Sequence, residues 1–306
     1  MGDLYLGIVI QFVLMGASFG LAWRLMRRAS NRTCDLLASI TVIGIAVYAR
    51  WFWEHSFMAR LLPFSNLIIV SNWFPLASGF LAGLVWQRIR DTPEHIPLLP
   101  VFGKFRGSPR RLFATTVLGI AGMATLVVPL LGQPPICGND WDGDLCYQTS
   151  PATCSAAAAS TLLQYHGIYV SEGEMAALCL TRRGTNWKGL YRGLVIQAAK
   201  ISHPVEVFDL SVDELIEQFT HPCILQCELK LDDEDASGKY ERDGWIRGQP
   251  HSVVLIEIHD DRFVVFDPSV GLEVEWDQDA MSTLWHGQGL RIVAPRSGSA
   301  PSVATR

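Results

Sequence analysis

Four long apolar stretches, separated by polar connections, dominate the N-terminal part of the chain. They cover residues 4–23, 36–53, 67–86 and 112–131. Each is close to the ~20 residues that an α-helix needs to cross a hydrocarbon core of roughly 30 Å. Trp and Tyr gather near several of the ends, as they do at membrane interfaces. We therefore expect residues 1–132 to form an all-α membrane region of about four transmembrane helices in contact with a lipid bilayer.

Basic residues are distributed unevenly over the connections between these stretches. Only Arg50 and Arg60 lie near the second connection, whereas the first and third are rich in Arg and Lys: Arg24, Arg27, Arg28 and Arg32 in the first, and Arg88, Arg90, Lys104, Arg106, Arg110 and Arg111 in the third. By the positive-inside rule, the first and third connections are cytoplasmic. An even number of spans then places both ends of the region outside, so we expect an inner (cytoplasmic) membrane protein whose remaining part is extracytoplasmic. The first stretch has no basic start and no evident cleavage site, which favours a retained helix over a signal peptide.

From residue 133 the apolar runs become short and alternate with polar positions. Helical patterns cover 171–181 and 187–202, and Ser211 with Glu214 forms a capping-box signature for a third helix. Strand patterns follow at 205–208, 223–228, 252–258, 263–266, 272–275 and 291–294. Helices followed by strands predict an α+β domain over 133–294, in which helices pack on an antiparallel sheet. The Ser-, Ala- and Pro-rich tail, 295–306, is expected to be disordered.

The two parts of the chain carry opposite charge. Residues 1–132 hold 12 Lys and Arg against 5 Asp and Glu, whereas the rest holds 13 against 25. An acidic outer domain argues against nucleic acid as a partner, because a protein that binds a phosphate backbone needs a positively charged surface.

One cysteine lies at a helix start. Pro151-Ala-Thr-Cys154 leads into an alanine-rich segment that stops at Gly167, a pattern that predicts a helix with Cys154 in its first turn. The free amides and the positive dipole end there favour a thiolate and can face an oxyanion. Gln148, six residues earlier, can add a side-chain NH2 donor to such an oxyanion hole.

A base and an orienting carboxylate occur further along the chain. Two β-branched runs, 251–258 and 263–266, flank a polar turn and predict an antiparallel hairpin. Folding about the turn brings Asp267, just before Pro268, back to the end of the sheet that holds His251. A Cys, His and Asp in reach of one another are the groups that nucleophilic thiol catalysis requires.

Residues 146 to about 270 resemble a peptidase family C39 domain, the papain-like cysteine peptidase best known for trimming leader peptides in bacteriocin exporters. The matching pieces are Gln148 six residues before Cys154, Tyr165-His-Gly167, 183–190, 222–226, and His251 followed by Asp267-Pro268. The resemblance implies Cys154 as nucleophile, His251 as general base and acid, Asp267 as orienter and Gln148 as oxyanion donor. We expect no metal and no other cofactor.

Two features depart from the family pattern. Ser155 follows the nucleophile where the family usually has glycine. The domain is C-terminal, and no Gly-rich Walker-type loop is present, so neither ATP binding nor leader trimming during export is expected.

We interpret the chain as a membrane-anchored cysteine peptidase that hydrolyses a peptide bond in a secreted or membrane-proximal peptide or protein. Cys154 lies only 23 positions after Leu131, a tether of at most about 75 Å. Two alternatives stay open: a catalytically idle C39-like module that binds peptide or protein, and an acyltransferase that uses the same triad.

The remaining cysteines carry further expectations. Cys137 and Cys146 bracket a polar loop and are the expected disulfide pair. Cys223 and Cys227, near His221, are expected on one buried strand face as core thiols, with zinc as the alternative. The acidic segment 230–245 is interpreted as a solvated loop, with a gate to the cleft as the alternative.

Overall fold

The computed structural model of the chain describes residues 1–90, 108–231 and 238–295. The chain divides into two compact units. One comprises Met1–Met58 and Asn66–Leu131, and the other comprises Ala59–Ser65 and Gly132–Arg306. The tail from 296, like Lys104 and Arg106, lies outside the described residues.

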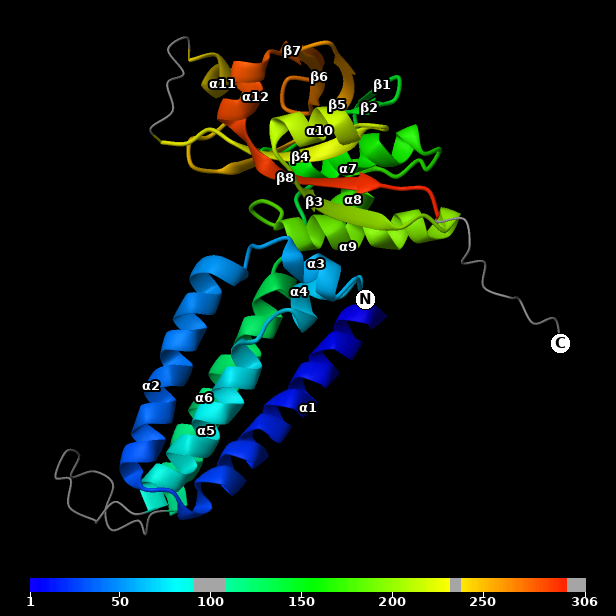
Figure 1. Cartoon of the computed structure of the whole chain (residues 1–306). Coiled ribbons are helices and arrows are strands. Elements are labelled where there is room, and N and C mark those ends of the chain that lie inside the picture. Colours follow the sequence, from blue (N-terminus) through cyan, green and yellow to red (C-terminus); the bar gives the residue numbers. More distant parts are fainter. Residues whose placement is uncertain (91–107, 232–237, 296–306) are drawn as a thin grey trace. The chain divides into compact units, whose positions relative to one another are not determined.

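The first unit is built from long apolar helices (Figure 1). Its elements are α1 (Gly2–Leu25), α2 (Asn31–Val47), α4 (Leu67–Val70), α5 (Phe74–Arg90) and α6 (Ser108–Val127), with α3 (Phe57–Leu61) at the boundary of the two units. Among the described residues, four helical segments are long and apolar enough to cross a membrane: Gly2–Arg28, Asn31–Phe52, Leu67–Ile89 and Pro109–Leu130. They coincide with the four predicted stretches, so the predicted all-α region of about four long apolar helices is confirmed.

Polar side chains inside this unit bind backbone carbonyl groups of neighbouring helices. Gln11 donates to the carbonyl of Val70 at 2.9 Å, Ser18 to that of Leu76 at 2.8 Å, and Gln87 to that of Trp23 at 2.9 Å. Such bonds satisfy polar groups in an apolar setting and fix how the helices meet.

The second unit contains an antiparallel sheet. Its order, among the described residues, is β3-β8-β4-β5-β6-β7. The strands are β3 (Val205–Asp209), β4 (Cys223–Glu228), β5 (Pro250–His259), β6 (Arg262–Asp267), β7 (Leu272–Trp276) and β8 (Trp285–Ile292); a small hairpin, β1 (Trp141–Asp142) and β2 (Leu145–Cys146), precedes them. The helices are α7 (Cys154–Tyr165), α8 (Glu172–Leu178), α9 (Trp187–Ala198), α10 (Val212–Gln218), α11 (Lys239–Arg242) and α12 (Gln278–Leu284). The predicted α+β class is confirmed.

The two faces of the sheet are covered differently. α7 contacts β5 and β4, and its residues Ala156–Ala159 are completely buried, because alanine lets a helix approach a sheet closely. The other face packs Cys223, Leu225, Val253 and Leu255 against the apolar residues of α10 and α12. α7 is therefore an internal helix, and the residue that starts it is held firmly.

The C-terminal end of the sheet differs from the sequence prediction. The last strand begins at Trp285 and not at residue 291, and α12, which precedes it, was not predicted. Asp277 caps α12 by accepting a bond from the Ala280 amide at 2.9 Å. A short amphipathic helix that runs straight into a strand has no glycine or proline between the two elements, so the sequence gives little boundary signal.

Candidate active site

Cys154 is the first residue of α7. Thr153 occupies the N-cap position, and the first helical bond runs from the Ala157 amide to the Thr153 carbonyl at 2.9 Å. The amides of residues 154–156 precede that bond and point out of the helix start. Partial positive charge therefore gathers around the sulfur of Cys154, as the sequence predicted.

His251 and Asp267 come from the neighbouring strands β5 and β6. In the ladder of these strands, Val254 of β5 is opposite Phe266 of β6, so Asp267 comes next to Val253. Val253 and His251 are two residues apart on β5 and therefore share a face of the sheet. Nε2 of His251 lies 2.8 Å from Oδ1 of Asp267. The structure thus brings together the two residues that the predicted hairpin placed within reach.

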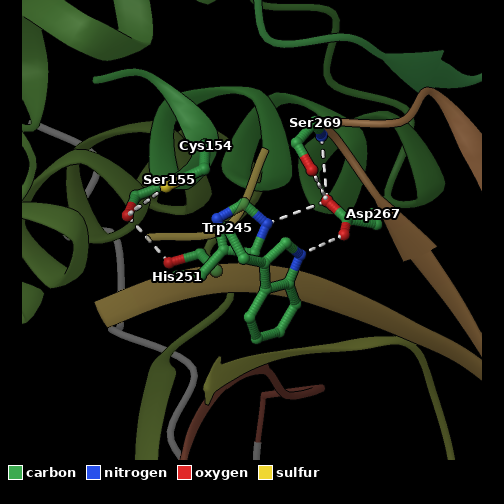
Figure 2. Close-up of polar contacts among 7 residues, drawn as sticks. Cys154, Ser155, Trp245, His251, Asp267 and Ser269 are labelled. Atoms are coloured by element: carbon green, nitrogen blue, oxygen red, sulfur yellow. Dashed lines mark hydrogen bonds and ion pairs between the residues drawn. The ribbon is translucent and has the colours of Figure 1, made fainter. Parts of the chain in front are cut away.

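The imidazole of His251 lies between the thiol and the carboxylate (Figure 2). Because Nε2 is engaged by Asp267, Nδ1 is the ring nitrogen left to face Cys154, and the neighbouring ring acts to lower the pKa of that thiol. All three side chains are buried or nearly so, with exposures of 9% for Cys154, 8% for His251 and 3% for Asp267. This arrangement can move a proton from sulfur to imidazole while the carboxylate fixes the ring orientation.

The carboxylate of Asp267 is held by further donors (Figure 2). The indole Nε1 of Trp245 donates to Oδ2 at 2.6 Å, and the amide and hydroxyl of Ser269 donate to Oδ1 at 2.9 and 2.7 Å. The Trp245 ring also packs on His251, with ring centroids 4.5 Å apart. Trp245 therefore covers the His251–Asp267 bond and shields it from water.

Trp245 and Ser269 were missed by the sequence analysis. Trp245 ends the acidic segment 230–245, which was interpreted as a solvated loop; that interpretation is wrong for Trp245, which is 3% exposed. A large aromatic residue in an otherwise polar run was the available signal, since such a residue usually finds an apolar partner. Ser269 follows Asp267 in an Asp-Pro-Ser turn, where short side chains commonly bond to one another and to the backbone.

The pKa values of the three groups shift in the directions that favour an ion pair. Burial by itself raises the pKa of Cys154, but hydrogen bonding and charge from His251, the Ser252 amide and the Ser155 hydroxyl outweigh it and lower that pKa. Burial by itself lowers the pKa of His251, while its bonds to Asp267 and Cys154 raise it to about 10. Burial raises the pKa of Asp267, and its bonds from His251, Ser269 and Trp245 bring it below the ordinary value.

Gln148 is anchored beside the Asp267-Pro268 turn. Its amide donates to the carbonyl of Pro268 at 3.0 Å, and its neighbour Thr149 is held by two bonds, of 2.8 and 2.6 Å, to the buried carboxylate of Glu172. Oε1 of Gln148 is buried and has no hydrogen-bond partner among the described residues. The loop that carries Gln148 is therefore fixed at the same end of the sheet as the other site residues.

The expected disulfide between Cys137 and Cys146 is wrong. All seven cysteines lie in the described part of the chain, and each is a free thiol. Cys137 donates to the Pro135 carbonyl at 3.4 Å and Cys146 to the Tyr147 carbonyl at 3.9 Å, so the two thiols are directed at different oxygens. Burial raises the pKa of Cys146 to about 12, which keeps it protonated.

Cys223 and Cys227 lie on the buried face of β4, as predicted. Among the described residues, no group of three or more His, Cys, Asp or Glu side chains is arranged to hold a metal ion.

No protein-family model and no curated protein matches the chain. Solved structures similar to it include the peptidase domain of Streptococcus ComA, a bi-functional ABC transporter involved in quorum sensing, with 16% identity over 49% of this chain and 98% of that chain and a TM-score of 0.39. A double glycine motif protease from an AMS/PCAT transporter, in complex with its leader peptide, shares 18% identity over 53% of this chain and 98% of that chain, with a TM-score of 0.38. A Bacillus anthracis protein described as a C39-like peptidase shares 14% identity over 54% of this chain and 99% of that chain, with a TM-score of 0.39. This likeness concerns the fold.

Proposed function

We propose that this protein is a membrane-anchored cysteine peptidase. The observation that carries the proposal is the His251 ring, which is bonded to the Asp267 carboxylate and lies between it and the Cys154 thiol at the start of a buried helix. A cysteine that only packs in the core, or a histidine that only ends a strand, does not need the other two side chains beside it. Nucleophilic catalysis by sulfur uses all three groups: a thiol, a base and a carboxylate that orients the base.

The proposed reaction has two halves. The Cys154 thiolate attacks the carbonyl carbon of a peptide bond, and the oxygen takes up negative charge opposite the first amides of α7 and the side chain of Gln148. The His251 imidazolium gives its proton to the departing amine, the C–N bond breaks, and an acyl-enzyme remains on sulfur. Neutral His251 then takes a proton from water, which attacks the thioester and releases the acid and the thiolate.

The membrane assignment supports a particular setting for this chemistry. The four apolar helices would anchor the chain in the inner membrane, and the distribution of basic residues over their connections favours an extracytoplasmic outer domain. A peptide or protein close to the membrane surface is the expected substrate, since the tether from Leu131 to Cys154 is short.

A digest of a defined peptide library tests the activity. Purified full-length protein in detergent is incubated with the library and an excess of glycinamide, and the products are identified by mass spectrometry. New carboxyl ends that depend on Cys154 support hydrolysis, and glycinamide adducts at those ends would replace hydrolysis by acyl transfer. A library left intact by protein whose Cys154 still reacts rapidly with iodoacetamide would overturn the peptidase proposal in favour of a binding module.

The orientation has a separate test. A reporter enzyme fused after Arg306 is expected to be active only in its extracytoplasmic form, and a cytoplasmic reporter at the same position should be silent. Activity of the cytoplasmic reporter would contradict the orientation and leave the chemistry of Cys154 untouched.

A further inference from the structure

A second hydrogen-bonded path reaches Cys154 from the side opposite to Asp267. It consists of Gln226 on β4, Ser252 on β5 and Ser155 on α7. Nε2 of Gln226 lies 2.8 Å from Oγ of Ser252, which lies 2.8 Å from Oγ of Ser155, and that hydroxyl is 4.0 Å from the sulfur of Cys154. Figure 2 shows the contact between Ser155 and Cys154.

The sheet register sets up this path. Gln226 and Ser252 are directly opposed in the β4–β5 ladder, so their side chains lie together on one face. Ser252 follows His251, and alternation along a strand directs the two side chains to opposite faces. One strand thereby supplies His251 on one side and Ser252 on the other, both near Cys154.

The Gln226 amide sets a direction that the donors and acceptors along the path can follow. The amide nitrogen of Gln226 can only donate, so Ser252 accepts from it and has its one proton free for Ser155. When Ser155 accepts that proton in turn, its own proton is available for the sulfur. Ser155 and Ser252 are 4% and 1% exposed, so solvent does not compete for these protons.

We infer that Gln226, Ser252 and Ser155 are positioning residues that form a directed hydrogen-bond chain, the last proton of which stabilises the thiolate of Cys154. The inference rests on the proposed function and deepens it. Ser155 stands where the resembling family usually has glycine, and the chain gives the hydroxyl at that position a role in the reaction. The Ser155 contribution to the lowered pKa of Cys154 agrees with donation towards sulfur.

Alkylation by iodoacetamide as a function of pH tests the chain without any substrate. Full-length protein in detergent is labelled between pH 4 and 10, and modification of the peptide that contains Cys154 is quantified by mass spectrometry. In Ser155→Ala protein we expect labelling about tenfold slower at acidic pH, since a bond to a charged group is lost, and unchanged labelling at high pH, where Cys154 is ionised with or without that bond. The buried Ser160 of the same helix provides the matched control, and Ser160→Ala should follow the wild-type curve.

The other two members sharpen the test. Ser252→Ala and Gln226→Met each leave Ser155 in place but remove what orients it, so a smaller slowing, about threefold, is expected at acidic pH. Because both act through Ser155, the double variant Ser155→Ala/Ser252→Ala should be no slower than Ser155→Ala alone. Gln226 is only partly buried, which makes Gln226→Met the variant most certain to fold.

Each contrary outcome has a defined meaning. A Ser155→Ala curve that superimposes on wild type overturns the chain, and so does a slowing by the same factor at every pH, which reports altered access to the sulfur. A Gln226→Met curve identical to wild type overturns the directing role of Gln226. Wild-type Cys154 that titrates at the ordinary thiol pKa overturns the activated thiolate of the proposed function as well, so the two failures are distinguishable.

Discussion

Two thiols flank His251, and their surroundings shift their pKa values in opposite directions. Cys154 starts α7 and contacts the imidazole, whereas Cys227 lies on β4 directly opposite His251 in the sheet register. Both are buried. The pKa of Cys154 is lowered, but that of Cys227 is raised well above its ordinary value by burial and by the negative charge of Asp267.

The comparison shows that proximity to a histidine is not enough to activate a cysteine. Cys154 has an imidazolium, a backbone amide and a hydroxyl directed at its sulfur, and a helix start behind it. Cys227 has apolar neighbours in the core and a carboxylate within electrostatic range. Burial disfavours the thiolate at both positions, and only at Cys154 do the neighbouring imidazole and hydrogen-bond donors outweigh it.

The largest expected effect separates the two thiols directly. Cys154→Ala should reduce peptide cleavage to background, since no other group supplies the nucleophile, and Cys227→Ala should leave cleavage within a few-fold of wild type. Initial rates on the most rapidly cut library peptide provide the measurement, with circular dichroism as the check on folding. Cleavage that persists in Cys154→Ala protein would remove the mechanism.

Gln148 tests whether the oxyanion needs more than the helix amides. Gln148→Ala should lower kcat by about 10² to 10³ if its side chain is an oxyanion donor. Iodoacetamide labelling of Cys154 should be unchanged, because the thiolate itself does not depend on Gln148. An unchanged kcat would assign the oxyanion to the backbone amides of α7 alone.

Asp267→Asn tests the source of the raised pKa of His251. The asparagine oxygen can still accept from Nε2, but the negative charge is lost and the amide NH2 meets the Trp245 N–H donor. We therefore expect kcat/KM to fall by at least about tenfold near pH 8. The alkaline limb of the pH–rate profile, governed by loss of the imidazolium proton, should move down from about 10. A limb that stays in place would contradict the role of the carboxylate charge.

The pH dependence of stability follows from the same shifts. Because the folded pKa of His251 is raised, its stabilising contribution is fully present below its ordinary pKa of about 6.5 and is lost as pH rises through about 10. The lowered pKa of Asp267 acts in the opposite sense, and its contribution is lost as the carboxylate becomes protonated in acid. Chemical denaturation of the wild type and of His251→Ala between pH 4 and 10 should show the two curves converging at the alkaline end, and parallel curves would contradict this assignment.

The smallest effect concerns a thiol with no proposed chemistry. Cys223→Ala should lower the free energy of unfolding by about 1 kcal/mol through lost packing, with peptide cleavage unchanged. Burial raises the pKa of Cys223 to about 12, so this thiol stays protonated and serves the core. A large loss of cleavage in this variant would show that Cys223 contributes to catalysis and is not a core thiol alone.

Local patterns in the sequence were sufficient to predict much of this molecule. Apolar runs of membrane-spanning length predicted the four long helices, alternation predicted most strands, and a proline, small residues and a glycine predicted the helix that begins at Cys154. These features depend on neighbouring residues, so they can be read along the chain. The polar turn also predicted the hairpin that pairs His251 with Asp267.

Contacts between residues distant in sequence were decided only by the tertiary structure. The position of Trp245 against His251 and Asp267 depends on the path of a polar loop, and the pairing of Ser155 with Ser252 depends on how α7 sits on the sheet. The same holds for the free state of Cys137 and Cys146, whose thiols are directed at different backbone oxygens. Sequence fixes which groups are available, but the free energy of a thiolate depends on which donors, charges and apolar groups surround it in space, and those come from packing.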